Sequence, residues 1–315
     1  MILTVTPNPS VDRTLEVGAL LRGGVVRVEG ARTQPGGKGV NVSRVLRRHG
    51  EDTTAVLPVG GAGGGRLSAL LADQGVSAVT VPIAAATRSN ITIAESDGVT
   101  TKLNLPGPAL TDAETDTLLG AVDAELERGP RWLVGAGSLP TGVAADFYPR
   151  LVRLAARHGV PVAIDTSGVP LEAAARQGGT ALLKPNHEEL AELLGRELST
   201  IGDVTDAARE VLAWGNQAVL ATLGSHGALL VTGDGTWWAG GAAVVPRSTV
   251  GAGDCALAGY LHTDGPPEER LRRAVAWGAA AVGLPGTTVP GPGDIDGDAV
   301  DAVTGPGRDL IIKEL

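Results

Sequence analysis

The chain has 315 residues, of which 43% are hydrophobic and 19% charged, and its formal net charge at pH 7 is -9. This length suits one large α/β domain or two smaller ones, and the acidic balance excludes broad binding to nucleic acid or membrane surfaces, which are polyanions. The single cysteine, Cys255, excludes an internal disulfide, and no HExxH or CxxC pattern indicates a zinc site. Without an apolar run of about 18 residues or a basic leader, the chain is expected to be cytoplasmic.

Short β-like runs alternate with amphipathic helical patterns along most of the chain, which predicts βα units on a mostly parallel sheet. Thr111 and Glu114 predict a capping box at the start of one helix. The expected strands are 2–7, 53–59, 131–136, 161–166, 181–186, 217–223 and 227–232. The expected helices are 38–49, 66–74, 111–128, 142–158, 187–194 and 203–214, with a further apolar helical run after Asp254.

Two regions break this alternation and contain no helical pattern. Residues 14–34 and 79–105 are rich in Val, Ile and Thr, and Ser96 to Gly98 forms a turn signal. We expect these two insertions to form a small antiparallel sheet, a lid, over one edge of the main sheet. The whole chain, 1–315, would then be a single domain with a lid, and residues 284–298 would form a long loop.

The segment Gly251 to Asp254, a Gly-Ala-Gly-Asp sequence, precedes the last apolar helical run. Glycines at such a junction let backbone N–H groups approach an anion, and the helix dipole favours negative charge there. Asp254 could then accept a proton from an attacking hydroxyl group. A tight turn that only begins a helix has the same pattern, so this segment alone leaves both interpretations open. Dinucleotide binding is disfavoured because neither this loop nor 59–71 has the last glycine of GxGxxG, and no Walker A pattern occurs.

A second glycine-rich segment lies near the N-terminus. In residues 35–41, Gly36 and Gly37 permit close backbone approach to a ligand, and Lys38 supplies a compact positive charge. Asn41 lies one helical turn later, where its amide can hydrogen-bond a hydroxyl group. Alone, the segment therefore leaves the ligand-binding interpretation open.

The third segment, residues 184–190, follows a predicted strand. Asn186 and Glu189 are three residues apart, so they face the same way at the start of a helix. They could hold the water shell of a Mg²⁺ ion that bridges nucleotide phosphates, or form a capping box, or do both.

Together and in this order, these segments resemble the ribokinase or PfkB family of carbohydrate kinases. GGKGVN at 36–41 resembles the family's N-terminal motif, STVGAGDCALAG from Ser248 its C-terminal motif, and TLGSHGA at 222–228 its nucleotide-binding loop. Within the family, TPNPSVD from Thr6 and GSLPTG from Gly137 resemble the phosphosugar branch. Residues 86–107 most resemble the 1-phosphofructokinases of that branch. The likeness extends from Val5 to about Thr288 and implies a three-layer α/β/α, ribokinase-like fold.

The resemblance also implies a reaction, in which the γ-phosphoryl group of ATP is transferred to a phosphosugar hydroxyl group. Fructose 1-phosphate is the favoured acceptor; a tagatose-6-phosphate kinase, a 6-phosphofructokinase and a non-catalytic sugar-phosphate-binding protein are the alternatives. Asp254 would be the general base, and the N–H groups of Gly251, Ala252 and Gly253 would form an anion hole.

The same resemblance assigns binding residues. Those implied for the phosphosugar are Asp12, Gly36, Gly37, Lys38, Asn41, Arg88, Asn104 and Arg27. Those implied for ATP are Lys184, Asn186, Thr222, Gly224, Ser225 and Gly227. Asn186 and Glu189 would hold Mg²⁺ through water, and a monovalent cation and a homodimer formed through the lid are further expectations.

Overall fold

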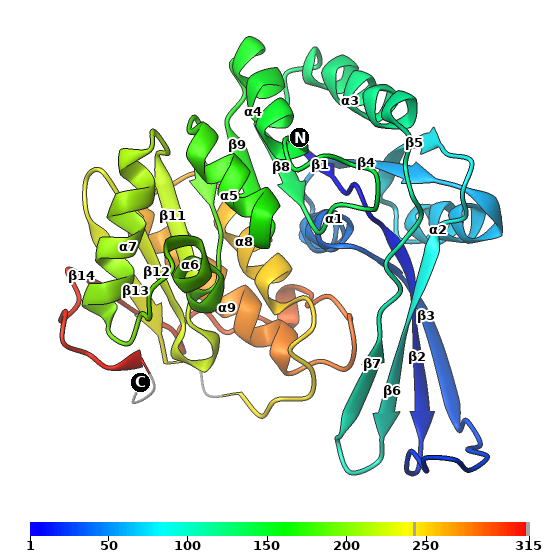
Figure 1. Cartoon of the computed structure of the whole chain (residues 1–315). Helices are drawn as coiled ribbons and strands as arrows, with labels where there is room; N and C mark the ends of the chain where they lie inside the picture. Colours follow the sequence, from blue (N-terminus) through cyan, green and yellow to red (C-terminus); the bar gives the residue numbers. More distant parts are fainter. Residues whose placement is uncertain (242–243, 313–315) are drawn as a thin grey trace.

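A large β-sheet forms the centre of the molecule in the computed structural model, which describes residues 1–241 and 244–312 (Figure 1). Its strands are β1 (Ile2–Val5), β4 (Thr53–Val59), β5 (Ser77–Pro82), β8 (Trp132–Ala136), β9 (Val162–Asp165), β10 (Leu182–Leu183), β11 (Ala218–Thr222), β12 (Ala228–Thr232), β13 (Thr236–Gly240) and β14 (Asp301–Thr304). Their spatial order is β14-β13-β12-β11-β10-β9-β8-β1-β4-β5. Every pair from β11 to β5 is parallel, and β12, β13 and β14 add antiparallel pairs at one edge, so the expected mostly parallel sheet is confirmed.

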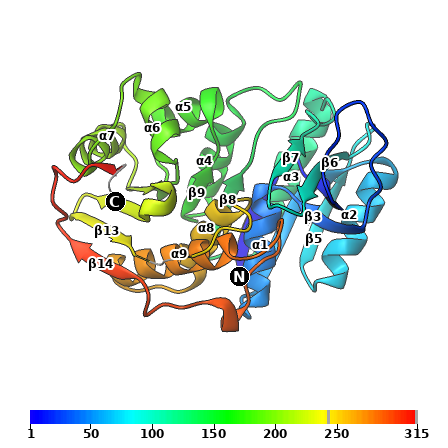
Figure 2. The same cartoon turned by 90° about the horizontal axis from the view of Figure 1, so that it is seen from below.

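Helices cover both faces of this sheet, which confirms the expected three layers. They are α1 (Lys38–Arg48), α2 (Gly61–Asp73), α3 (Asp112–Leu126), α4 (Phe147–Arg157), α5 (Gly168–Gln177), α6 (His187–Leu194), α7 (Ile201–Ala213), α8 (Ala252–His262) and α9 (Pro267–Val282). Figure 2 shows α3 to α7 on one face and α1, α8 and α9 on the other. The alternation of side chains along a strand explains how β1 serves both faces, since Leu3 packs with the α3 to α7 layer and Ile2 with the α1 and α8 layer.

A chain of hydroxyl groups fixes α1 on the sheet. The hydroxyl of Ser43 in α1 is 2.8 Å from that of Thr4 and 2.7 Å from that of Thr53, and all three residues are buried. Paired in this way, they satisfy one another without water. They therefore set the position of the helix that carries Lys38 and Asn41.

A second, four-stranded sheet projects from the body (Figure 1). Its strands are β2 (Ser10–Val17), β3 (Gly30–Gly36), β6 (Arg88–Glu95) and β7 (Thr100–Leu103), in the order β3-β2-β6-β7. The expectation of a wholly antiparallel sheet is wrong, because β2 and β6 are parallel. Each leaves the carboxyl end of a parallel strand, β1 and β5 respectively, so the two run outward in the same direction.

The boundaries of the second insertion also differ from expectation. Residues 79–82 belong to β5, which pairs with β4 in the main sheet, and only β6 and β7 enter the small sheet. The reason is the βαβ unit formed by β4, α2 and β5, whose crossover returns the chain parallel to β4.

Several helix assignments from the sequence need correction. α5 and α9 were not expected, α2 begins at Gly61 rather than residue 66, and α4 begins at Phe147 rather than residue 142. The left-handed φ of 87° at Gly142 is incompatible with a helix that begins at residue 142. The capping box of Thr111 and Glu114 is confirmed, with both reciprocal hydrogen bonds present. No helix in the described part of the chain is long and apolar enough to cross a bilayer.

Candidate active site

The predicted site residues gather where the carboxyl ends of the parallel strands meet the first turns of α1 and α8. Asp165 ends β9, Lys184 follows β10, and Thr222 ends β11. Loops at this edge of a parallel sheet are the usual place for ligand sites, because the strand ends converge there and helix N-termini point at it.

Asp254 lies in the first turn of α8 and is only 5% exposed. Its Oδ2 accepts a hydrogen bond of 2.8 Å from Nδ2 of Asn41, a residue 213 positions earlier in the chain. Burial, and then the charge of Asp165, raise the pKa of Asp254 to about 6, although Lys38 and the Asn41 hydrogen bond oppose the rise. Such a carboxylate is mostly ionised at neutral pH and can accept a proton.

The residues before Asp254 form a glycine-rich helix start of the kind that suits an anion. Gly251 has a φ of 80° and precedes the first residue of α8, a left-handed conformation that glycine adopts without strain. The first α-helical bond of this turn runs from the Cys255 N–H to the Gly251 carbonyl at 2.9 Å, and the N–H groups of the first turn face the helix end. The Ala252 N–H also makes a long contact of 3.5 Å with the Thr249 carbonyl. A Cβ added to Gly253 would be 3.2 Å from Lys184 Nζ, so an ammonium group lies beside these donors.

Two lysines converge on one buried carboxylate. Lys38 Nζ is 2.8 Å from Asp165 Oδ1, and Lys184 Nζ is 3.0 Å from Asp165 Oδ2. Burial alone would raise the pKa of the fully buried Asp165, but the two ammonium groups lower it overall. For Lys38, burial acts to lower the pKa, while Asp165, Asp254 and Glu189 raise it above its usual value. The side chains of both lysines are therefore held in fixed positions by one carboxylate.

The base of the small sheet supplies a second group of polar side chains. Asp12 on β2 accepts hydrogen bonds at Oδ1 from Ser10 (2.6 Å) and from Asn90 (3.0 Å). A Cβ at Gly36 would overlap the Asp12 carboxylate, so glycine is required for this packing. Asp12 and Gly36, which were predicted as phosphosugar-binding residues from separate segments, therefore lie in contact.

Arg88 on β6 reaches across to the loop that follows β1. Its Nη1 donates to the Leu105 carbonyl at 2.6 Å and its Nη2 to the Asn8 carbonyl at 3.0 Å. Burial lowers the pKa of Arg88, while Asp12 opposes this. Within the described residues, buried polar atoms without a hydrogen-bond partner cluster here and include Arg88 Nε, Asn8 Oδ1 and Asn90 Oδ1. Unpaired buried polar atoms are unfavourable, so this cluster is suited to a polar ligand.

The Asn186 and Glu189 pair forms the capping box of α6. Glu189 N–H donates to Asn186 Oδ1 at 2.7 Å, and Asn186 N–H donates to Glu189 Oε2 at 2.8 Å. Among the described residues, no three His, Cys, Asp or Glu side chains are grouped as a direct metal site. This donor set therefore fits Mg²⁺ only through its water shell, with a carboxylate oxygen of Glu189 left for that role.

The expected nucleotide-binding loop lies next to this capping box. Thr222 forms an isolated parallel bridge with Asn186, and its N–H donates to the Pro185 carbonyl at 3.0 Å. Gly224 begins the short 3₁₀ helix η1 (Gly224–His226), which contains Ser225 and is followed by Gly227. The structure thus brings the 184–190 and 222–228 segments together.

Two predicted residues lie apart from this group. Arg27 is exposed in the loop between β2 and β3, and Asn104 is exposed just after β7. Neither forms a side-chain hydrogen bond or an ion pair within residues 1–241 and 244–312. Both lie on the projecting part of the molecule, so they would approach the other residues only through movement of the small sheet or through a second chain.

Sequence reasoning missed several residues of this region. Asp165, Asn8 and Asn90 were not assigned, and neither was Arg44, whose Nη1 donates to Asn41 Oδ1 at 3.0 Å. For Asp165 and Asn8 a signal existed, since each lies at the end of a predicted strand, where parallel strands place functional groups. Arg44 has no such signal because it lies inside a helix.

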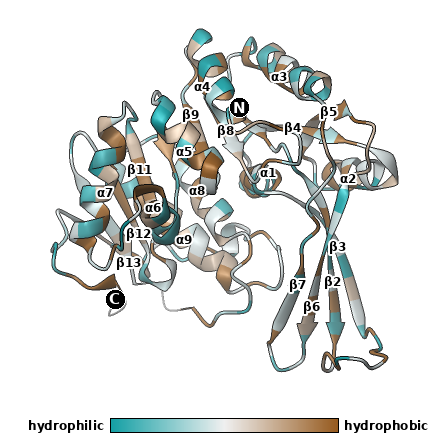
Figure 3. Ribbon diagram, in the orientation of Figure 1, coloured by the Kyte–Doolittle hydropathy of each residue, from teal (hydrophilic) through white to brown (hydrophobic). Residues whose placement is uncertain are grey.

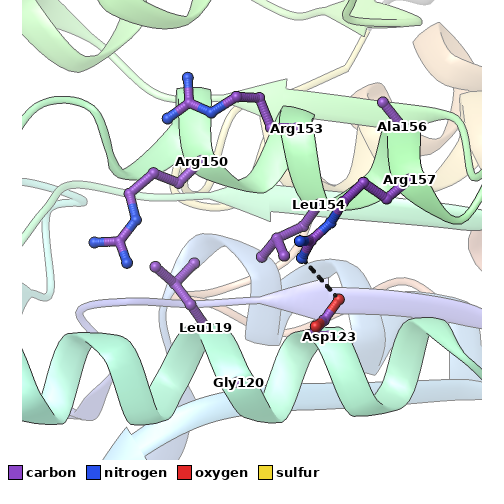
Figure 4. Close-up of a pocket in the computed structure, with 8 residues that line it drawn as sticks. All are labelled: Leu119, Gly120, Asp123, Arg150, Arg153, Leu154, Ala156 and Arg157. Carbon is purple, nitrogen blue, oxygen red and sulfur yellow. Dashed lines mark hydrogen bonds and ion pairs between the residues drawn. The ribbon is translucent and has the colours of Figure 1, made fainter.

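A hollow of about 610 Å³ lies elsewhere, between α3 and α4 (Figure 4). It contains none of the predicted site residues. Two of the arginines beside it are paired with acids of α3, Arg150 with Asp116 and Arg157 with Asp123, while Arg153 donates to Gln177 Oε1 at 3.0 Å. These pairs link the two helices, so we assign the hollow no part in the chemistry.

Comparison with known proteins gives the family. The pfkB family carbohydrate kinase model matches residues 7–293. The chain is 38% identical over 299 residues to a 1-phosphofructokinase of Haloferax volcanii, covering 94% of this chain and 95% of the relative. It is 37% identical over 291 residues to ATP-dependent 6-phosphofructokinase isozyme 2 of Escherichia coli, covering 91% and 94%.

A solved structure agrees with the fold. Phosphofructokinase-2 from Escherichia coli in complex with potassium superposes with a TM-score of 0.87 and 34% identity, covering 93% of this chain and 96% of that one. The ribokinase-like fold expected from the sequence is thereby confirmed. This chain belongs to the PfkB family of carbohydrate kinases and is an ATP-dependent phosphosugar kinase.

Proposed function

We propose that this kinase phosphorylates fructose 1-phosphate to fructose 1,6-bisphosphate, with Asp254 as its general base. The observation that carries the proposal is the buried Asp254 carboxylate, held by Asn41 beside the first turn of α8 and the Lys184 ammonium. A proton acceptor and an anion site in one place are what phosphoryl transfer to a hydroxyl group requires.

Each of these residues has a defined part in the reaction. Asp254 accepts the proton of the sugar hydroxyl group. The sugar oxygen then forms a bond to the γ-phosphorus of ATP, while the bond from that phosphorus to the ADP oxygen breaks. The N–H groups of Gly251, Ala252 and Gly253 stabilise negative charge on the transferred group, a contribution of roughly 3 kcal/mol per donor in comparable sites. Lys184 adds positive charge beside them.

The phosphosugar would bind between the first turn of α1 and the base of the small sheet. Asp12 and Asn41 would hold sugar hydroxyl groups, and Arg88 and Lys38 the phosphate already on the sugar. Arg88 suits this role because only two of its five donors are used by backbone carbonyls, and a guanidinium fork matches phosphate oxygens. Arg27 and Asn104 would join this site when the small sheet closes.

We propose fructose 1-phosphate as the substrate because residues 86–107 most resemble the 1-phosphofructokinases. This segment contains Arg88, Asn90 and Asn104. The 38% identity to a protein named 1-phosphofructokinase supports this choice. Proteins named 6-phosphofructokinase isozyme 2 are nearly as similar, at 36% and 37% identity, so that activity is the second candidate.

ATP would be bound by Lys184, Asn186 and the loop at 222–228. Mg²⁺, when bound with ATP, would neutralise phosphate charge, and Glu189 with Asn186 would hold it through water. We also expect a monovalent cation to assist, in line with the potassium named for the Escherichia coli structure.

The small sheet would act as a lid and as a dimer contact. Figure 3 shows hydrophobic residues toward its free end, where Leu21 is 63% exposed and Val25 91% exposed. Exposed apolar side chains of this kind are stabilised by burial against a second copy. We therefore propose a homodimer formed through the lid. The closed lid would also exclude water from the transferred phosphoryl group.

A coupled ADP-release assay tests the proposal, with fructose 1-phosphate, fructose 6-phosphate, tagatose 6-phosphate and ribose compared at saturating MgATP. We expect the highest kcat/KM with fructose 1-phosphate. A higher value with fructose 6-phosphate or tagatose 6-phosphate would reject the substrate but keep the reaction. No turnover with any phosphosugar would reject the function, and an Asp254→Ala variant within tenfold of the unsubstituted enzyme would reject the base.

A further inference from the structure

Arg44 is a buried cation that the reaction described above does not use. It lies one helical turn after Asn41 on α1 and is 3% exposed. Arginine is rarely buried unless its charge is paired, yet Arg44 forms no ion pair within the described residues. Neutral acceptors hold it instead, and burial lowers its pKa to about 10, which leaves it charged at neutral pH.

The acceptors of Arg44 come from four separate segments. Its Nε donates to Gln74 Oε1 at 2.8 Å, just after α2. Its Nη1 lies within hydrogen-bond distance of three oxygens, those of Asn41 Oδ1 (3.0 Å), the Thr287 carbonyl (3.1 Å) and the Pro35 carbonyl (3.2 Å). The guanidinium group is thus fixed from several sides and cannot rotate freely.

This arrangement determines which way the Asn41 amide faces. A guanidinium group has only donors, and an ionised carboxylate has only acceptors. The amide therefore places Oδ1 toward Arg44 and Nδ2 toward Asp254, as the two distances of 3.0 and 2.8 Å record. The opposite orientation would set donors against donors on one side and acceptors against acceptors on the other, so it is excluded while Arg44 is present.

We propose that Arg44 is a positioning residue that fixes the Asn41 amide so that its N–H donates to Asp254, an inference that rests on the proposed function of Asp254. It does not touch the reacting atoms. It acts through Asn41, and it requires the guanidinium group rather than positive charge alone, because a single ammonium group cannot reach the Gln74 and Asn41 oxygens together in this fork.

The same guanidinium group gives a structural role to the long loop at 284–298. This loop reaches Arg44 through the Thr287 carbonyl, and the Thr287 hydroxyl donates to Gln34 Oε1 on β3 at 2.9 Å. Pro35, another Arg44 acceptor, also lies on β3. Arg44 therefore connects the amide that holds Asp254 with the base of the small sheet.

The variants Arg44→Met and Arg44→Lys test the proposal, with Arg47→Met as the matched control on the exposed side of α1. For Arg44→Met we expect kcat to fall at least tenfold. We also expect the acid limb of the pH profile to move upward by about one pH unit, since a lost hydrogen bond to a carboxylate raises its pKa. Arg44→Lys should recover only part of both effects, and Arg47→Met should leave both unchanged. Lys38, Lys184 and Asp165, which also face Asp254, are the same in all variants. Arg44→Met removes the charge of Arg44, which also interacts with Asp254, whereas Arg44→Lys keeps a positive charge, so the comparison of the two separates charge from the guanidinium fork.

A double-mutant cycle with Asn41→Ala separates positioning from simple support of the fold. If Arg44 acts through the Asn41 amide, adding Arg44→Met to Asn41→Ala lowers kcat less than threefold and moves the acid limb no further. A purely structural role of Arg44 predicts a lower Tm, an unshifted pH profile, and the full loss of kcat when Arg44→Met is added to Asn41→Ala. Either the unshifted profile or the full loss of kcat would overturn the inference. If Arg44→Met does not fold, Arg44→Lys gives the same test, and an unshifted acid limb there would count against the proposal.

Failure of this inference and failure of the proposed function give different results. Unsubstituted enzyme that phosphorylates no sugar, or an active Asp254→Ala variant, would reject the function of Asp254. An active unsubstituted enzyme and an inactive Asp254→Ala variant, combined with an ordinary pH profile for Arg44→Met, would reject only the role of Arg44.

Discussion

Replacing Asp254 with asparagine should abolish activity and at the same time stabilise the fold. The carboxylate is buried, and its pKa rises from the ordinary value of 3.8 to about 6. The native state therefore holds this proton more tightly than the unfolded chain does. The resulting stability is present below about pH 4 and is lost as the pH rises through 6, since the native state must then keep a buried charge. Asparagine stays neutral at every pH and can still accept the Asn41 hydrogen bond.

The size of this effect follows from linkage. One pKa unit corresponds to about 1.4 kcal/mol, so the raised pKa of Asp254 lowers the free energy of unfolding by about 3 kcal/mol at pH 8, where the native carboxylate is ionised. At pH 5, where the native carboxyl group is mostly protonated, the loss is roughly half of that. The stability advantage of Asp254→Asn should therefore grow by roughly 1 to 2 kcal/mol between these two pH values. Loss of a general base should lower kcat by about 10² to 10⁴-fold.

Urea unfolding at pH 5 and pH 8, together with the ADP-release assay, measures both effects. Asp234→Asn, in the exposed turn between β12 and β13, is the control for a carboxylate that is removed from the surface. An Asp254→Asn variant with more than a tenth of the normal kcat would refute the catalytic reasoning. An advantage of equal size at pH 5 and pH 8 would refute the electrostatic reasoning, even if the activity were lost.

Three further substitutions give separate predictions. Arg88→Ala should raise KM for the phosphosugar by about 10 to 100-fold and change kcat less than threefold, because a charged hydrogen bond is worth about 1.5 to 3 kcal/mol; steady-state kinetics checks this. Asp165→Asn should lower the free energy of unfolding by about 3 to 5 kcal/mol, because it leaves the buried Lys184 without its charged partner. It should also raise KM for ATP. Urea unfolding measures the first effect and kinetics at varied ATP concentration the second. Gly251→Ala should cost about 1 to 2 kcal/mol of stability from its φ of 80° alone, since the nearest atoms to an added Cβ are 3.9 Å away, and should lower kcat as the N–H groups turn; unfolding and kcat are measured together.

The parts of the fold that the sequence predicted are those with local causes. Alternating strand and helix patterns indicated the parallel sheet, and Thr111 with Glu114 indicated a capping box that the structure contains. α5 was missed because it opens with Gly168, Val169 and Pro170, which read as a turn. α9 was missed although Pro267 and the two glutamates after it are ordinary signals of a helix start.

The remaining differences have causes that lie far apart in the chain. The assignment of residues 79–82 to the main sheet depends on the return crossover through α2 and not on their composition. The contact between Asn41 and Asp254 joins residues 213 positions apart, so neither segment alone indicates it. Arg44 reads as an ordinary helix residue, and only the packing of three other segments around it reveals that it is buried.

The charges around Asp254 explain why the buried Asp165 belongs to the site. Lys38, Lys184, Asp165 and Asp254 carry no net charge when all four are ionised, yet the site is proposed to receive the phosphates of ATP. Those phosphates would raise the pKa of Asp254 beyond 6 and leave it protonated, unless positive charge lies nearby. Lys38 and Lys184 lower that pKa and so favour the ionised form of Asp254, which can accept a proton, whereas Asp165 raises it and favours the protonated form. Its benefit is positional, because without it the two ammonium groups would have no fixed place beside the anion site. Asp165 opposes the ionised form of Asp254 and is still consistent with catalysis, because it holds in place the two cations that favour that form.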